Sequence, residues 1–208
     1  MIAIMKKSMA RMEKSEMKVS REQMAENRRR ILEAASRLFR EKGFEAVGVA
    51  EIMKALGLTH GGFYGHFSSK DDLIVQALAH AVGERNGATL SLPAYLEEYL
   101  SPRHRDNRAG GCPISGLAAD TLRQAPEARA AVTDGVRVQL DWMSEKFPEA
   151  TEADRRRRAI GSWSAMVGAT ILARVMVDPV LSEEILTETL AWINDGPGQQ
   201  APALSEPQ

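Results

Sequence analysis

The stretch from 49 to 73, VAEIMKALGLTHGGFYGHFSSKDDL, constrains the fold more than any other part of the sequence. Apolar residues recur at helical spacing before Gly57, and glycine ends a helix readily because it enters the left-handed conformation without a clash. Beyond it, the hydroxyl of Thr59 can cap a second short helix, in which Phe63 and Phe67 share one face. The spacing therefore predicts two short helices joined by a tight turn, a helix-turn-helix.

A polar surface and a third helix follow from the same stretch. Ser68 or Ser69 precedes Lys70 and two aspartates, which predicts an N-cap with acids in the first helical turn. The face opposite the two phenylalanines carries small and polar residues, namely His60, Gly61, Tyr64 and His66.

Residues 28–83 resemble the DNA-binding domain of the TetR family of bacterial transcriptional regulators, and LGLTHGGFYGHFSSKDDL is close to that family's signature. The resemblance covers about a quarter of the chain. It implies that the helix from Thr59 to His66 enters the major groove and that Tyr64, His66 and Lys70 contact phosphates. The residues expected at the DNA are Arg28, Thr59, His60, Gly61, Gly62, Tyr64, His66 and Lys70.

Two features depart from the family's habit. Gly48 and Ala50 stand where members often place polar side chains at the DNA, so the helix after Gly48 should contribute little to contact. Glycines at 61, 62 and 65 each cost a helix roughly 1 kcal/mol relative to alanine. We therefore expect the reading helix to be weak by itself, and readout to depend on His60, Tyr64, His66 and DNA shape.

The distribution of charge favours the first part of the chain as the DNA-binding part. Residues 1–83 hold 14 lysines and arginines against 10 acids, whereas residues 84–208 hold 13 against 18. The basic run 28–30 is typical of a solvated face, but beside a helix-turn-helix it favours a phosphate contact by at least one arginine.

Composition favours an all-α protein, because aromatic content is only 5% and Ala, Leu, Met, Glu and Arg are abundant. The single cysteine, Cys112, excludes an internal disulfide. No apolar run is long enough for a bilayer and the start lacks a signal-peptide core. We therefore expect a cytoplasmic protein with no membrane partner.

The sequence predicts four regions. Residues 1–19 are a flexible extension, with a basic arm for the DNA minor groove as the alternative. A three-helix DNA-binding domain spans 20–83 and begins at Ser20, which with Gln23 resembles a capping box. A helical ligand-binding and dimerisation domain spans 84–195, and 196–208 is a disordered tail. In the family, the helix after Leu73 transmits the effect of the ligand.

Residues 101–111, SPRHRDNRAGG, predict a surface loop, after a loop at Asn86 and Gly87. We expect His104 to be solvated, because no second metal ligand lies at useful spacing. Cys112 then begins a helix, where the helix dipole favours the thiolate. The alternatives for Cys112 are a small buried hydrophobe and a thiol that senses electrophiles or oxidants.

Apolar helices end the domain. The helix from about 152 to 178 has few charges after its first turns, and the helix at 181–194 is amphipathic. In the family the last two helices form a four-helix bundle between subunits, which implies a homodimer. We expect an unknown small molecule to bind near Tyr95, Cys112, Leu117, Leu140 and Trp163.

The sequence therefore predicts a homodimeric repressor that leaves a palindromic operator in double-stranded DNA when an inducer binds. One alternative is a DNA-binding regulator with no ligand, whose C-terminal domain serves only dimerisation or protein interaction. Another is a thiol enzyme with His104 as base for Cys112, which would leave the helix-turn-helix unexplained. We expect no catalytic site, no metal and no cofactor.

Overall fold

The computed structural model describes residues 2–84, 90–149 and 151–196, with side chains for 21–83, 90–149 and 151–196. Regular structure in these ranges is helical throughout, as the composition predicted. The predicted tail beyond Gly196, the predicted loop at Asn86 and Gly87, and the side chains of the predicted extension 1–19 lie outside them. The predicted division into four regions stays a prediction.

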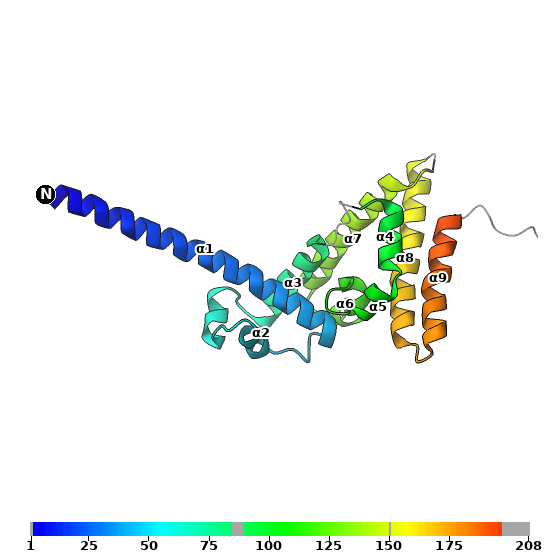
Figure 1. Cartoon of the computed structure of the whole chain (residues 1–208), viewed down its shortest axis with the longest axis horizontal. Helices are drawn as coiled ribbons and strands as arrows, with labels where there is room; N and C mark the ends of the chain where they lie inside the picture. The colour runs from blue at the N-terminus through cyan, green and yellow to red at the C-terminus, as the bar shows by residue number, and fades with distance from the viewer. Residues whose placement is uncertain (1, 85–89, 150, 197–208) are drawn as a thin grey trace, which may run out of the picture.

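The N-terminal half contains α1 (Ile2–Lys42), α2 (Val49–Ala55), the 3-10 helix η1 (His60–Gly65) and α3 (Lys70–Glu84) (Figure 1). Gly57 follows α2 at a φ of 69°, in the left-handed conformation that the sequence predicted, and Gly43 ends α1 in the same way at 84°. The predicted start of the first helix at Ser20 was wrong, since α1 begins at Ile2. Residues 2–19 contain neither glycine nor proline and are rich in good helix formers.

One apolar core holds α1, α2, η1 and α3 together. Phe39 meets Phe44 edge to face at 5.2 Å, and both rings are buried with Ile31, Ile52 and Leu73. Leu117 of the C-terminal half belongs to this core as well. The two halves therefore share apolar contacts, and the reading element rests on a continuous support.

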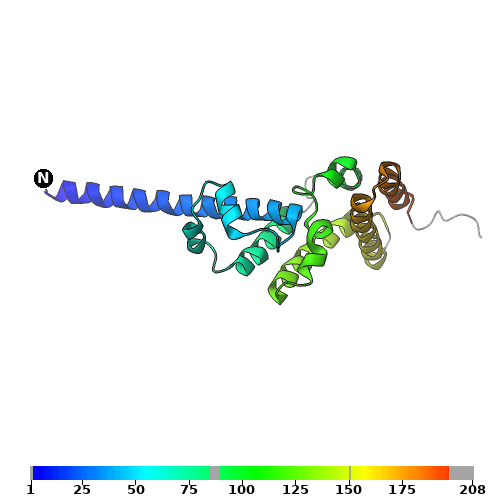
Figure 2. The ribbon, with the colours of Figure 1, turned by 90° about the horizontal axis from the view of Figure 1, so that it is seen from below.

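The C-terminal half contains α4 (Leu92–Tyr99), α5 (Pro102–Asp106), α6 (Pro113–Thr121), α7 (Pro126–Lys146), α8 (Glu152–Val175) and α9 (Pro179–Asp195). Thr151 caps α8, because its hydroxyl accepts from the N–H of Asp154 at 3.1 Å. Helices α8 and α9 pack side by side at the end of the molecule far from the start of α1 (Figures 1 and 2). None of the described helices combines the length and apolar content needed to cross a bilayer.

Residues 101–111 are not the plain surface loop that the sequence predicted. Pro102 begins the short helix α5, which the hydroxyl of Ser101 caps through the N–H of His104. His104 is buried, so its predicted solvation was wrong. The turn of α5 brings its ring between α4 and the start of α6, where backbone groups satisfy both ring nitrogens.

Helices α3 and α7 approach each other closely at Gly135. A Cβ atom built on Gly135 of α7 would lie 1.8 Å from Cγ1 of Val82 on α3. Only glycine fits here, because real atoms never approach so closely without something moving. The end of α3 is therefore fitted directly into α7.

Candidate nucleic-acid interface

The predicted reading helix is a 3-10 helix rather than an α-helix. Thr59 caps it as the sequence predicted, since its Oγ1 accepts from the N–H of Gly62 at 3.3 Å. At the other end the N–H of His66 donates to the carbonyl of Phe63 at 2.9 Å. Three glycines within seven residues weaken an α-helix, and the tighter helix suits such short segments.

This short helix presents an exposed surface over a buried aromatic pair. Phe63 and Phe67 are buried and stack at 5.5 Å. Tyr64 leaves 64% of its surface exposed, and its ring meets that of His60 edge to face at 5.9 Å. Gly61 has open space where a side chain would stand. The backbone of η1 can therefore approach a DNA groove closely, with Tyr64 and His60 as its projecting rings.

Arg28 does not point freely into solvent. Its guanidinium donates to the carbonyl of His66 and to the side chain of Gln76, and it lies 4.5 Å from the ring centroid of Phe67. A cation over an aromatic face adds attraction to these hydrogen bonds. Arg28 thus fastens α1 to the end of η1 and to α3, a role for which the sequence held no signal.

His66 and Lys70 lie where η1 passes into α3, and both are partly exposed. Burial lowers the pKa of His66, and the charge of Arg28 lowers it further. The imidazole is therefore neutral near pH 7, and any phosphate contact that it makes is a hydrogen bond rather than an ion pair. Lys70 supplies the positive charge at this junction.

The start of α3 carries the cap that the sequence predicted, with Ser69 as the capping residue. Its hydroxyl accepts from the N–H of Asp72 at 3.0 Å, while the Asp72 carboxylate accepts from the N–H of Ser68 at 2.9 Å. Asp72 also accepts from Gln76, which in turn receives Arg28. A chain of hydrogen bonds therefore joins the cap to α1.

The residues expected near a ligand do not all come together. Tyr95, Cys112 and Trp163 line one small cavity of about 20 Å³ between α4, α6, α7 and α8. Leu117 lies instead in the core of the N-terminal half, and Leu140 packs in the core of the C-terminal half. Gln139, for which the sequence gave no signal, also lines the cavity, and its buried Nε2 has no hydrogen-bond partner.

His104 and Cys112 are neighbours, but their arrangement does not suit a thiol enzyme. The N–H of Cys112 donates to Nε2 of His104 at 2.9 Å, so Nδ1 holds the proton and donates to the carbonyl of Tyr99 at 2.7 Å. Both ring nitrogens are thus engaged by backbone groups. His104 therefore has no lone pair left to accept a thiol proton, and it serves to hold the start of α6.

Comparisons with known proteins find relatives of the part of the chain that contains these residues. Residues 31–77 match the family model described as "Bacterial regulatory proteins, tetR family". The chain is 40% identical over 53 residues to the regulator YerO of Bacillus subtilis, covering 26% of this chain and 18% of YerO. It is 32% identical over 123 residues to the repressor AcnR of Corynebacterium efficiens, covering 56% and 65% respectively. In both cases the match spans less than two thirds of the relative's length.

A solved structure extends the likeness to most of the chain. The crystal structure of a TetR transcriptional regulator from Chloroflexus aurantiacus superimposes with a TM-score of 0.67 and 26% identity. The match covers 83% of this chain and 96% of that one, so it includes both halves. The helix-turn-helix, the family match over residues 31–77 and this shared all-helical architecture make the chain similar to the TetR family of bacterial regulatory proteins.

Proposed function

We propose that this protein is a homodimeric transcriptional repressor that binds DNA through η1 and releases it when a small molecule binds the C-terminal half. The observation that supports DNA binding best is the exposed face of η1, with Tyr64 and His60 projecting over a buried aromatic pair. The matched family model covers this face. The relative AcnR is described as a repressor, which supports repression over activation.

Exposed apolar side chains on α8 and α9 support the homodimer. Leu172 on α8 leaves 51% of its surface exposed and Trp192 on α9 leaves 53%. Ile160 and Leu181 add to the same pair of helices. A second copy of the chain that covered these residues would remove them from water and would place two η1 elements on a palindromic operator.

The cavity around Cys112 supports an inducer site. Tyr95 and Trp163 give it aromatic walls, and the unpartnered Nε2 of Gln139 offers a donor to an acceptor atom on the inducer. The cavity also touches Val82 of α3, so an occupant that widened it would press on the helix that leads to η1. Cys112 is buried at the same wall, which makes a reactive inducer a covalent variant of this proposal.

The size of the cavity keeps one alternative open. A volume of about 20 Å³ accommodates little more than one water molecule, so an inducer requires the cavity to expand. A regulator without an inducer, whose C-terminal half serves only dimerisation or protein interaction, fits the closed cavity equally well. Ligand-dependent release from DNA separates the two functions.

The test is binding to labelled DNA from just upstream of the protein's own gene, followed by fluorescence anisotropy at several salt concentrations. Lys70→Ala should weaken binding to all sequences alike and reduce the salt slope by about one phosphate contact. Tyr64→Phe should also weaken binding to all DNA sequences alike. Arg137→Ala, which changes an exposed side chain on α7, is the control and should leave DNA affinity unchanged. Wild-type affinity in both interface variants would place the DNA elsewhere.

The same assay tests the inducer site with a thiol-reactive quinone and Cys112→Ser. Release of the wild type but not of Cys112→Ser identifies Cys112 as the sensor. If quinone does not change the DNA affinity of either protein, Cys112 is a buried packing residue. Noncovalent inducers would then be screened.

A further inference from the structure

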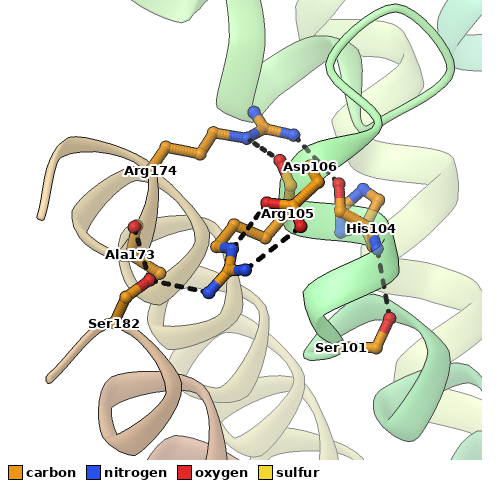
Figure 3. Close-up of polar contacts among 7 residues, drawn as sticks. All are labelled: Ser101, His104, Arg105, Asp106, Ala173, Arg174 and Ser182. Carbon is orange, nitrogen blue, oxygen red and sulfur yellow. Dashed lines mark hydrogen bonds and ion pairs between the residues drawn. The ribbon is translucent and has the colours of Figure 1, made fainter. Parts of the chain in front are cut away.

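We propose that a cleft formed by α5, the start of α6, the end of α8 and the start of α9 binds a small organic acid. Its volume of about 580 Å³ lies within the roughly 300–1,000 Å³ typical of small-molecule sites. None of its lining residues lines the cavity around Cys112, so the two sites are separate. Figure 3 shows the polar side chains at its base.

Arg105 is fixed at the base of the cleft. Its Nη1 donates to Oγ of Ser182 at 2.9 Å, while Nε and Nη2 donate to the Asp106 carboxylate at 2.7 and 3.1 Å (Figure 3). Only 16% of its side-chain surface is exposed. The hydrogen bond from Arg105 lowers the pKa of Asp106, so this pair stays ionised. A guanidinium held in this way needs no reordering before it binds an anion.

Arg174 is also held in place, and three of its hydrogen bonds run to neutral acceptors. Nε donates to the carbonyl of Arg105 at 2.9 Å, Nη1 to Oγ of Ser115 at 3.1 Å and Nη2 to the carbonyl of His104 at 3.3 Å. Arg108 is a third cation at the cleft. Against these three arginines, Asp106 is the only acid among the described lining residues, so the cleft has an excess of positive charge.

An apolar wall stands beside the charged base. Ile171 and Val175 of α8 and Pro179 of α9 line it together with Val177, whose surface is 99% exposed. The arginines match the geometry of a carboxylate, and the wall would shield a hydrocarbon chain from water. An inorganic anion would use the charges alone. The combination therefore favours an acid with an apolar body.

The base of the cleft is joined to α1 through one loop. Arg174 holds the carbonyl of His104, whose ring holds the N–H of Cys112. The carbonyl of Gly111 between them accepts from Nη1 of Arg40 on α1 at 3.2 Å. A Cβ on Gly111 would lie 2.8 Å from Nη2 of Arg174, so this junction is closely packed. A bound acid that shifts Arg174 would therefore shift the support of α1.

Calorimetry on the full chain tests the site with three probes: sodium octanoate, octanol and inorganic phosphate. Octanoate should bind at least tenfold more tightly than either phosphate or octanol. Val177→Asp and Arg108→Gln change exposed side chains, and each should weaken octanoate binding at least tenfold. Arg123→Gln changes an exposed side chain outside the cleft and should leave octanoate binding unchanged. Equal binding of octanol and octanoate, or unchanged octanoate binding in Val177→Asp, would overturn the proposal.

The coupling to α1 rests on the proposed DNA-binding function and has its own readout. Octanoate should change the affinity of the wild type for upstream DNA, measured by anisotropy, at least threefold. It should not change the DNA affinity of Val177→Asp. Sedimentation should show that the oligomeric state of both proteins is the same. Octanoate binding without any change in DNA affinity would refute the coupling and retain the site. A protein that binds no DNA even without acid would refute the proposed function, and calorimetry would still decide the site.

Discussion

Arg28, Arg29 and Arg30 are consecutive in the sequence but have three different environments. Arg29 forms exposed ion pairs with Glu26 and Glu33, and Arg30 donates to the carbonyl of Leu56 at 3.4 Å. Only Arg28 joins α1 to η1 and α3. Its partners lie 38 and 48 residues away, so no local pattern could distinguish it from its neighbours.

We expect Arg28→Ala to lower the free energy of unfolding by about 1–3 kcal/mol, because the carbonyl of His66 and the side chain of Gln76 lose their donor. DNA affinity should fall while its salt slope stays unchanged, since Arg28 is engaged within the protein. Urea denaturation and anisotropy at several salt concentrations measure both effects. Arg29→Ala, in an exposed pair, should change stability by less than about 0.5 kcal/mol. A smaller salt slope in Arg28→Ala would show a phosphate contact instead.

Asp72 should make stability depend on acid. The backbone N–H of Ser68 lowers the pKa of its carboxyl, and the side chain of Gln76 lowers it further. Because the folded pKa lies below the unfolded one, the contribution is present above the unfolded value of 3.8 and is lost as pH falls through the folded pKa. The stability gap between wild type and Asp72→Asn should therefore be full at pH 7 and shrink toward pH 3.

Thermal unfolding of both proteins at pH 7, 5 and 3 measures that gap. Asp71→Asn is the matched control, since Asp71 is exposed in the same helical turn. A gap that does not change with pH would mean that ionisation of the Asp72 carboxyl does not contribute to stability.

At the scale of the element, the glycines of η1 lower its helical stability and leave its surface open to a ligand. Gly61 has a backbone conformation that alanine accepts, and a methyl group added there would meet nothing within 4 Å. Gly61→Ala should therefore raise the free energy of unfolding by up to about 1 kcal/mol and yet weaken DNA binding, because the methyl group would stand on the exposed face. Denaturation and anisotropy test the two signs together. Gly83→Ala, also in open space on α3, should stabilise without the loss of DNA affinity.

Local chemistry decided what the sequence could predict about these elements. Thr59 as a cap and Gly57 as a helix end were confirmed, because each depends on its own few neighbours. The 3-10 geometry of η1 was missed, although the glycines that favour it are local. The burial of His104 was missed because it depends on tertiary partners. His104 is enclosed only once α4, α5 and α6 meet, and its polar side chain gave no sign of this.

At the scale of the whole molecule, the exposed apolar residues of α8 and α9 predict the state of assembly. Leu172→Glu would place a charge in the proposed contact between copies and should convert the dimer to a folded monomer, since Leu172 is half exposed within its own chain. Sedimentation equilibrium and circular dichroism measure assembly and fold. Val138→Glu on α7 introduces the same charge at a similarly exposed residue and should leave the dimer intact. If both Leu172→Glu and Val138→Glu remain dimers, the contact between copies does not include Leu172.

The crossing of α3 and α7 limits how this protein can be recombined with its relatives. Val82 occupies the space that any side chain at position 135 would need. A hybrid protein that joins this N-terminal half to the C-terminal half of a relative therefore needs glycine at the position equivalent to 135. Otherwise Val82 has to be replaced by a smaller residue. The two halves are therefore adapted to each other at this contact. An exchanged half that places even one methyl group at position 135 would clash with Val82, whatever DNA or ligand it binds.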